Sequence, residues 1–287
     1  MRNTSITTAI TRASDTSFYY AFALLRKKQR EAIHALYAFC RIVDDIADEP
    51  GDIDIRRSEL HRWKAEIAAC YEGRPDDPVA LRLKDAIREF NLPRPAVEEI
   101  LTGVAMDLEK NRYESFEELR RYCHHVASAV GLCCIEIFGY RDADARRFAE
   151  SLGIALQLTN IIRDVEVDLK KDRIYLPRED MDRFGVKESD LKDRRYGEAV
   201  IALMRFEAKR ARKFYKEAWA ILPPCDRHHL FAAVIMGRIY HCLLDEVQAH
   251  GFRKLDGSVR ISKLRKLSIA THCWLTSRMG LLFNRTG

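Results

Sequence analysis

The sequence predicts an all-α protein, and three observations favour that fold class. Gly and Pro are scarce, since 13 Gly and 8 Pro are present in 287 residues, and their share of about 7% lies below the usual share of roughly 12%. Apolar residues recur with helical periodicity along nearly the whole chain. Hydrophobic residues make up 47% and charged residues 32%, which allows a sizeable core. We expect a single domain over residues 1–287, with residues 1–13 as a loose N-terminal segment.

The helical segments follow one another with short interruptions. The first, residues 17–49, has a break near Leu25–Lys28 and stops at Pro50 and Gly51. Ser115 and Glu118 form the pattern of a capping box at the start of a later helix. Gly or Pro marks most of the other boundaries. The remaining predicted helices cover residues 53–72, 78–90, 95–112, 115–139, 142–170, 195–221, 226–250 and 261–283.

The cysteines and the apolar runs exclude several classes of protein. The 8 Cys are scattered with neither a CxxC motif nor a paired His spacing, so no zinc site or disulfide framework is predicted. No apolar run approaches the length of a membrane-spanning helix, and the N-terminus lacks the apolar core of a signal peptide. We expect a cytoplasmic protein, and the sequence predicts no oligomeric state.

The positive charge is concentrated near the C-terminus. Residues 251–287 contain eight basic residues and one acidic residue, Asp256. This asymmetry favours an anionic surface as a partner and argues against nucleic acid. The amphipathic stretch Lys263–Phe283 has two interpretations. It is the last core helix with a solvated basic face, or it makes a peripheral contact with anionic lipid at the inner face of the membrane.

Two segments carry polar stripes beside apolar helix faces. One stripe comprises Tyr37, Arg41, Asp44 and Asp48, and the other comprises Gln157, Asn160, Asp164 and Asp168, with Arg163 adjacent. Spacings of three and four residues keep each set on one helix face. Aspartates four apart repel each other, and burying them without partners costs more. A Mg²⁺ ion between the stripes would remove both costs and would bind a diphosphate. The alternative is two solvated helix faces.

Several motifs, in this order along the chain, resemble the squalene/phytoene synthase family over about residues 14–250. They are Ser17–Tyr20, Ala35–Glu49, Tyr122–Gly131, Leu156–Asp164 and Asp172–Pro177. Within the family, residues 127–131 and 135–139 resemble the bacterial presqualene diphosphate synthases of hopanoid biosynthesis. The resemblance implies a single all-α isoprenoid-synthase bundle with a central cavity.

The resemblance also implies the site residues. About two or three Mg²⁺ ions would be held by Asp44, Asp48, Asn160, Asp164 and Asp168, of which the four aspartates would be catalytic through the metal. Contacts with the diphosphate or the prenyl chain are implied for Ser14, Ser17, Tyr37, Arg41, Gln157, Arg163 and Tyr240. Tyr122 matches a tyrosine with a catalytic role in the first half-reaction.

The chain departs from the family pattern in two places. Val167 stands where Glu is frequent, with Glu166 one position earlier, so the number of acidic ligands on this helix stays open. Val104 and Ala105 replace a common Met-Glu pair, and Asp107 is therefore given little weight. The segment that holds Arg173 and Tyr175 either forms a flap over the site or ends a helix.

The implied reaction joins two farnesyl diphosphates head to head into presqualene diphosphate. The metal neutralises the departing diphosphate, and Arg41 and Arg163 add hydrogen-bond donors. The aromatic rings that would face the allylic cation are those of Tyr37, Phe18, Phe22 and Tyr122. Either Tyr122 or the released diphosphate accepts the proton that is lost.

Four alternatives stay open, and NADPH is not expected to be a cofactor. The first is a phytoene synthase that uses geranylgeranyl diphosphate, and the second is a squalene synthase that uses NADPH. The third is a class I terpene cyclase, and the fourth is a helical adaptor without activity.

Overall fold

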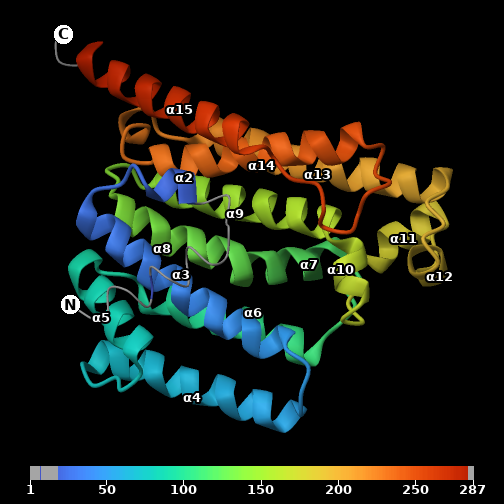
Figure 1. Ribbon diagram of the computed structural model, residues 1–287, viewed down its shortest axis with the longest axis horizontal. Coiled ribbons are helices and arrows are strands. Elements are labelled where there is room, and N and C mark those ends of the chain that lie inside the picture. The colour runs from blue at the N-terminus through green and yellow to red at the C-terminus, as the bar shows by residue number, and fades with distance from the viewer. Residues whose placement is uncertain (1–6, 8–18, 284–287) are drawn as a thin grey trace.

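The computed structural model describes Thr7 and residues 19–283, which form a layered bundle of helices with no β-strand among them (Figure 1). The fold is all-α, as predicted. The first half of the bundle contains α2 (Tyr19–Phe22), α3 (Lys27–Asp48), α4 (Ile53–Glu72), α5 (Pro78–Phe90), α6 (Arg94–Glu109), α7 (Phe116–Cys123), the π-helical turn η1 (His124–Ser128) and α8 (Ala129–Phe138). The second half contains α9 (Asp144–Arg163), α10 (Val165–Leu169), α11 (Arg178–Phe184), α12 (Glu188–Lys192), α13 (Glu198–Ile221), the 3₁₀ turn η2 (Pro224–Asp226), α14 (Phe231–Ala249) and α15 (Lys263–Phe283).

Helix α9 lies in the middle of the bundle. It packs against α7, α8, α13 and α14, while α3 packs against α4, α5, α6 and α8. In Figure 1, α3 to α6 lie on one side of α9, and α13 to α15 lie on the other. The two helices that were predicted to carry the polar stripes, α3 and α9, therefore belong to neighbouring layers of one core.

Side-chain caps fix the starts of several helices. The carboxylate of Asp52 accepts hydrogen bonds from the backbone N–H groups of Asp54 and Ile55 at the start of α4, and Asp77 caps α5 in the same way. Ser115 caps α7 by accepting from the N–H of Glu118 at 3.3 Å. Only half of the predicted capping box is present, because the Glu118 carboxylate accepts from the N–H of Glu114 instead.

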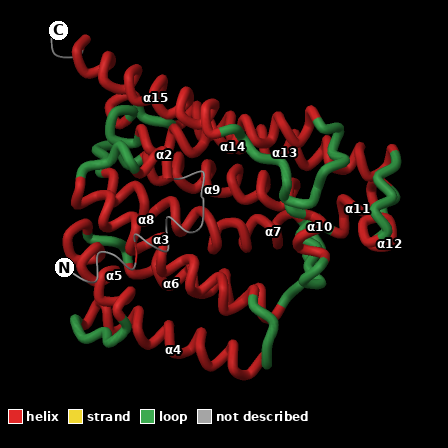
Figure 2. Tube along the Cα trace, in the orientation of Figure 1, coloured by secondary structure: helices red, strands yellow, loops and turns green. Residues whose placement is uncertain are grey.

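The helix predicted over residues 142–170 is interrupted at Asp164, where φ is −105° and ψ is 13°. The segment between α14 and α15 covers this break (Figure 2). The N–H of Gly257 donates to the carbonyl of Arg163 at 3.2 Å, and the N–H of Glu166 donates to the carbonyl of Leu255 at 2.8 Å. The prediction of one continuous helix was wrong because this distant segment satisfies the backbone groups that the break exposes.

The helix predicted over residues 115–139 is continuous but contains the π-helical turn η1. Two glycines make room for the wider turn. A Cβ atom on Gly153 would lie 2.7 Å from the backbone of Ser128, and one on Gly103 would lie 2.6 Å from the side chain of Val126. The turn thus fits closely between α6 and α9, which suits the frequent occurrence of π-turns at functional sites.

No helix of the described residues is both long enough and apolar enough to cross a membrane.

Candidate active site

A polar cavity of about 400 Å³ lies between α3 and α9, and we refer to it as the polar chamber. It is lined by 11 of the predicted site residues, namely Tyr37, Arg41, Asp44, Asp48, Tyr122, Gln157, Asn160, Arg163, Asp164, Asp168 and Tyr240. Ser14 and Ser17, together with Phe18, fall outside the described residues. The two acidic rows therefore face one cavity, and they are not two unrelated helix faces.

A second cavity of about 240 Å³, the apolar chamber, continues from the first. Seven residues border both chambers: Tyr37, Cys40, Asp44, Val126, Gln157, Asn160 and Tyr240. Beyond them the lining is almost entirely apolar and includes Phe22, Leu36, Phe138, Phe148 and Met236. A charged head group and an apolar chain of one ligand can therefore lie in adjoining compartments.

Two carboxyl groups of the polar chamber are poorly compensated. The Asp44 side chain opens onto the chamber, yet desolvation by the surrounding protein, followed by the charges of Asp48 and Asp107, raises its pKa to about 7. Burial and the neighbouring Asp164 raise the pKa of Asp168 to about 8. Since the ionised forms are disfavoured, the chamber favours a positively charged group beside them.

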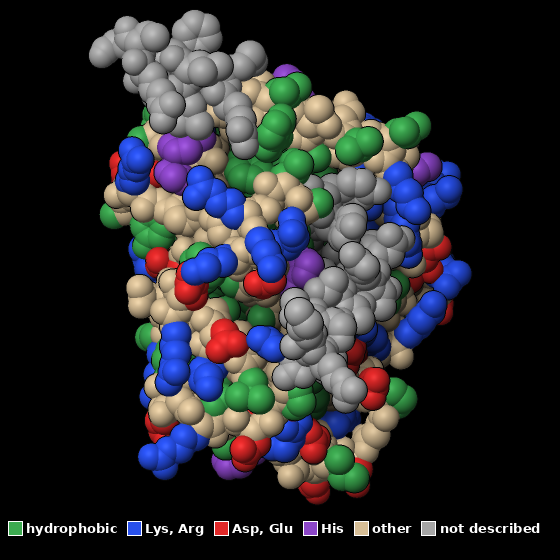
Figure 3. Space-filling model, turned by 60° about the vertical axis from the view of Figure 1, so that its left-hand side comes forward, with side chains coloured by type: hydrophobic (Ala, Val, Ile, Leu, Met, Phe, Trp, Pro, Cys, Tyr) green, Lys and Arg blue, Asp and Glu red, His purple; other side chains and the backbone are tan. Residues whose placement is uncertain are grey.

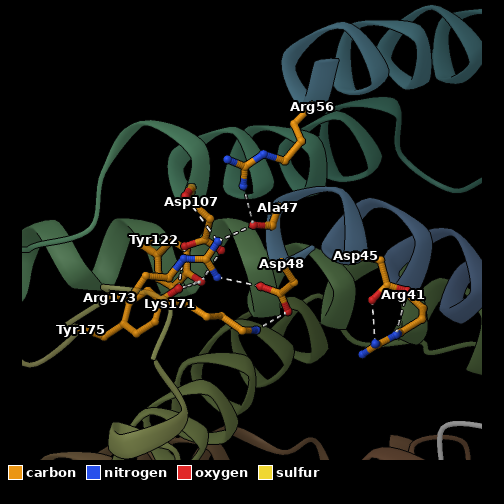
Figure 4. A network of polar contacts seen from close by, with 10 residues as sticks. All are labelled: Arg41, Asp45, Ala47, Asp48, Arg56, Asp107, Tyr122, Lys171, Arg173 and Tyr175. Atoms are coloured by element: carbon orange, nitrogen blue, oxygen red, sulfur yellow. Dashed lines mark hydrogen bonds and ion pairs between the residues drawn. The ribbon is translucent and has the colours of Figure 1, made fainter. Parts of the chain in front are cut away.

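The other two aspartates of the rows have cationic partners. Asp48 contacts Nζ of Lys171 at 2.8 Å and Nη1 of Arg173 at 2.7 Å (Figure 4). Burial opposes ionisation of Asp48, but these two cations lower its pKa overall. Asp164 pairs with its neighbour Arg163, whose Nε donates to Oδ1 at 2.7 Å.

The oxygen atoms that line the polar chamber are of the kinds that a hard divalent cation prefers as ligands. The stripe residues offer carboxylate and amide oxygens, which Mg²⁺ prefers. Oδ1 of Asn160 is buried and lacks a hydrogen-bond partner among the described residues. Within the same part of the chain, no three His, Cys, Asp or Glu side chains converge closely enough to hold an ion by themselves. An ion here would thus complete its coordination with water or phosphate oxygens.

A hydrogen-bonded group of three side chains lies on another wall of the polar chamber. The Tyr122 hydroxyl donates to Oδ2 of Asp107 at 2.9 Å, and the Tyr175 hydroxyl donates to Oδ1 at 2.7 Å. The rings of Tyr122 and Tyr175 stack with centroids 5.0 Å apart. Burial raises the pKa of Asp107. Asp107 was given little weight from the sequence, yet it joins both tyrosines.

Arg173 and Tyr175 enter the chamber from the segment that follows α10. The N–H of Ile174 donates to the carbonyl of Asn111 at 2.9 Å, and the N–H of Arg178 donates to the carbonyl of Tyr113 at 2.9 Å. The segment is thus attached to the connection between α6 and α7. It supplies a wall of the chamber, which favours the flap interpretation over a simple helix end.

Arg41 of the first stripe and Glu166, whose role as a ligand the sequence left open, have orientations that the spacing could not predict. Arg41 lines the chamber, but its guanidinium pairs with Asp45, Nη2 to Oδ1, at 2.6 Å (Figure 4). Glu166 is buried outside the lining and accepts from the Tyr196 hydroxyl at 2.8 Å, with Arg194 at 2.9 Å. Glu166 therefore anchors α10 and leaves Asp164 and Asp168 as the acidic groups of this helix segment that face the chamber.

The fold and these two chambers define an all-α isoprenoid synthase. Residues 11–265 match the squalene/phytoene synthase family, and the chain belongs to it. The family consists of head-to-head prenyltransferases.

Three similar proteins show the range of the family. The chain is 34% identical to a chloroplastic phytoene synthase of an Oncidium hybrid cultivar over 88% of its own length, and it spans 62% of that protein. It is 36% identical to a presqualene diphosphate synthase of Rhodopseudomonas palustris, over 90% of this chain and 92% of that protein. A crystal structure of a dehydrosqualene synthase with a bound ligand superposes with a TM-score of 0.87 at 32% identity, covering 96% of this chain and 97% of the other.

Proposed function

We propose that this protein condenses two farnesyl diphosphates into presqualene diphosphate and releases one diphosphate. The observation that carries the proposal is the pairing of the polar chamber, with its two acidic rows, and the apolar chamber that continues from it. The polar chamber would take the diphosphates and the apolar chamber would take prenyl chain. An adaptor without activity would have no use for poorly compensated carboxyl groups in a cavity.

Mg²⁺ would be held by Asp44 and Asp48 on one side and by Asn160, Asp164 and Asp168 on the other. When bound, it supplies positive charge that stabilises the departing diphosphate. Arg163 and Arg41 add hydrogen-bond donors with a geometry suited to phosphate oxygens. Arg41 would have to leave Asp45, and Arg163 would have to share its donors with the substrate.

The reaction begins when the bond between C1 and oxygen of one substrate breaks and the diphosphate leaves with the electron pair. The double bond of the second substrate then attacks C1, and closure of the cyclopropane ring releases a proton. The apolar wall excludes water from the allylic cation. Tyr122 would accept the proton on its hydroxyl oxygen while its own proton passes to Asp107, at 2.9 Å. Released diphosphate is the alternative acceptor.

Product analysis by mass spectrometry tests the proposal. The purified chain is incubated with Mg²⁺ and either farnesyl or geranylgeranyl diphosphate, with and without NADPH. We expect presqualene diphosphate to accumulate from the farnesyl substrate even when NADPH is present. Squalene formed with NADPH, phytoene formed from the longer substrate, or a cyclic product from one substrate would each replace the proposal by the corresponding alternative.

A further inference from the structure

Helix α15 presents two apolar faces, although only one contacts the bundle. Ala270 and Cys273 are 2% and 4% exposed and lie on the inner face. Leu264, Leu267 and Leu275 are 81%, 53% and 48% exposed. Their spacing places the three leucines on a single stripe of the helix, turned away from Ala270 and Cys273. We refer to these three residues as the leucine stripe.

The leucine stripe is unusual for the surface of this protein. Large exposed hydrophobic side chains among the described residues are few, and the others are Leu24 and Ile55. Single exposed apolar residues are ordinary, but Leu264 and Leu267 lie one turn apart and Leu275 lies two turns farther along the same face of α15. Such recurrence on one helix face favours an interaction site. A partner that binds the leucine stripe must therefore bury these leucines in an apolar environment.

Basic side chains precede and flank the leucine stripe along the chain. Exposed basic residues are Arg253, Lys254, Arg260, Lys263 and Arg265, and Arg265 also pairs with Glu246 of α14. Asp256 is the sole acidic residue between positions 251 and 277. Green apolar side chains occur along the upper edge of Figure 3, at the level of α15 in Figure 1, and blue basic side chains lie below them on both flanks. The partner must therefore also be negatively charged.

The position of α15 connects the leucine stripe with the apolar chamber. Helix α15 packs against α14 and α2. These two helices contribute Phe22, Ala233 and Met236 to the apolar chamber. A single layer of helix thus separates the chamber from the surface that carries the leucine stripe.

We propose that the outer face of α15 docks on a bilayer that contains anionic lipid. The leucines enter the boundary between head groups and acyl chains, and the basic residues contact lipid phosphates. The proposed contact is peripheral, because α15 would lie along the surface of the bilayer with its inner face still packed on the bundle. This inference concerns binding and does not require the proposed reaction.

Vesicle flotation of the full-length protein tests the inference. The vesicles contain phosphatidylcholine alone or mixed with phosphatidylglycerol. We expect binding to the mixed vesicles and a loss of at least about tenfold in affinity when Leu264, Leu267 and Leu275 are changed to Ser. Ile55→Ser is the matched control, since Ile55 is 65% exposed on α4. Lys254→Glu with Lys263→Glu should weaken binding similarly, whereas Lys64→Glu on α4 should not.

Three outcomes would overturn the inference. The first is that the wild-type protein does not float with mixed vesicles. The second is that the leucine variant and the Ile55 control lose equal vesicle affinity. The third is that the leucine variant changes only self-association, as measured by analytical ultracentrifugation. Circular dichroism confirms that each variant is folded. Flotation without any prenyltransferase activity would remove the proposed function and support the docking surface, so the two can fail separately.

Discussion

Arg173 holds the end of α3 from a position 125 residues farther along the chain. Its Nη1 donates to Oδ1 of Asp48 at 2.7 Å, and its Nη2 donates to the carbonyl of Ala47 at 2.8 Å (Figure 4). The side chain of Arg173 is 7% exposed. One guanidinium thus satisfies a terminal carbonyl of the helix and fixes the orientation of an aspartate in the first acidic row.

Replacing Arg173 with Met should therefore impair both stability and catalysis. We expect the free energy of unfolding to fall by about 1–3 kcal/mol, because the hydrogen bonds of the buried guanidinium to Asp48 and Ala47 are lost, while Asp48 keeps its contact with Lys171. We expect kcat to fall about 100-fold, because Asp48 loses its position. Urea unfolding and steady-state kinetics measure the two effects. Arg178→Met is the control, since that side chain is 69% exposed. A stability loss with normal kcat would show that Arg173 only supports the fold.

Changing Asp44 and Asp164 together to Asn should abolish turnover and preserve the fold. The two substitutions remove one carboxylate from each acidic row, and Asn is a neutral residue of similar shape. We expect kcat to fall by about 1,000-fold or more. Product formation and circular dichroism are measured side by side, with Asp54→Asn on α4 as the control. Normal turnover in the double variant would contradict the metal hypothesis.

Gly257→Ala tests whether the segment after α14 positions Asp164. Gly257 has a φ of +73°, and a Cβ atom there would lie 3.0 Å from Oδ1 of Asp164. We expect a stability loss of about 1 kcal/mol from the backbone strain and a fall in kcat of about tenfold. Gly51→Ala is the control, because its Cβ would meet no atom within 4 Å. Equal kinetics for both variants would exclude a positioning role for this segment.

The pH dependence of stability should report on Glu207. This residue is 2% exposed, and Nη1 of Arg210 contacts both Glu207 and Asp180 at 2.7 Å. Burial raises the pKa of Glu207 to about 7 from 4.5, and Asp180 adds to the increase. The folded state therefore binds this proton more tightly than the unfolded state, so the stability contribution falls between about pH 4.5 and 7 and is constant above.

We expect Glu207→Gln to remove this part of the pH dependence. Between pH 5 and pH 7, the wild-type free energy of unfolding should lose about 1–3 kcal/mol relative to the variant. Urea unfolding across this range measures the difference, with the exposed Glu198→Gln as the control. Parallel pH profiles for the wild type and Glu207→Gln would contradict the assignment.

The features that depend on local periodicity, which are the helices and their polar faces, could be predicted from the sequence. The helical segments and the two stripes follow from spacings of three and four residues, and the stripe residues do face one chamber. Break positions depend on distant contacts. The interruption at Asp164 is satisfied by Leu255 and Gly257, which lie about 90 residues away in the chain, and no local pattern encodes such a contact.

The role of Asp107 also escaped sequence reasoning for a physical reason. Its significance comes from Tyr122 and Tyr175, which are 15 and 68 residues away and reach it only in the folded chain. Glu166 shows the converse. The sequence left open whether it is a ligand, and Tyr196 and Arg194 hold it outside the chamber. Side-chain direction at such positions is decided by tertiary partners.

The common border of the two chambers has a consequence for redesign. A substitution at Gln157 or Tyr240 would change both the binding of the diphosphate head group and the volume available to the prenyl chain. Phe138 and Phe148 border only the apolar chamber, so size changes there should retune chain-length preference while leaving diphosphate affinity intact. Libraries that vary Phe138 and Phe148 can therefore change substrate length without disturbing the diphosphate site, whereas libraries at the shared border must accept changes in both properties.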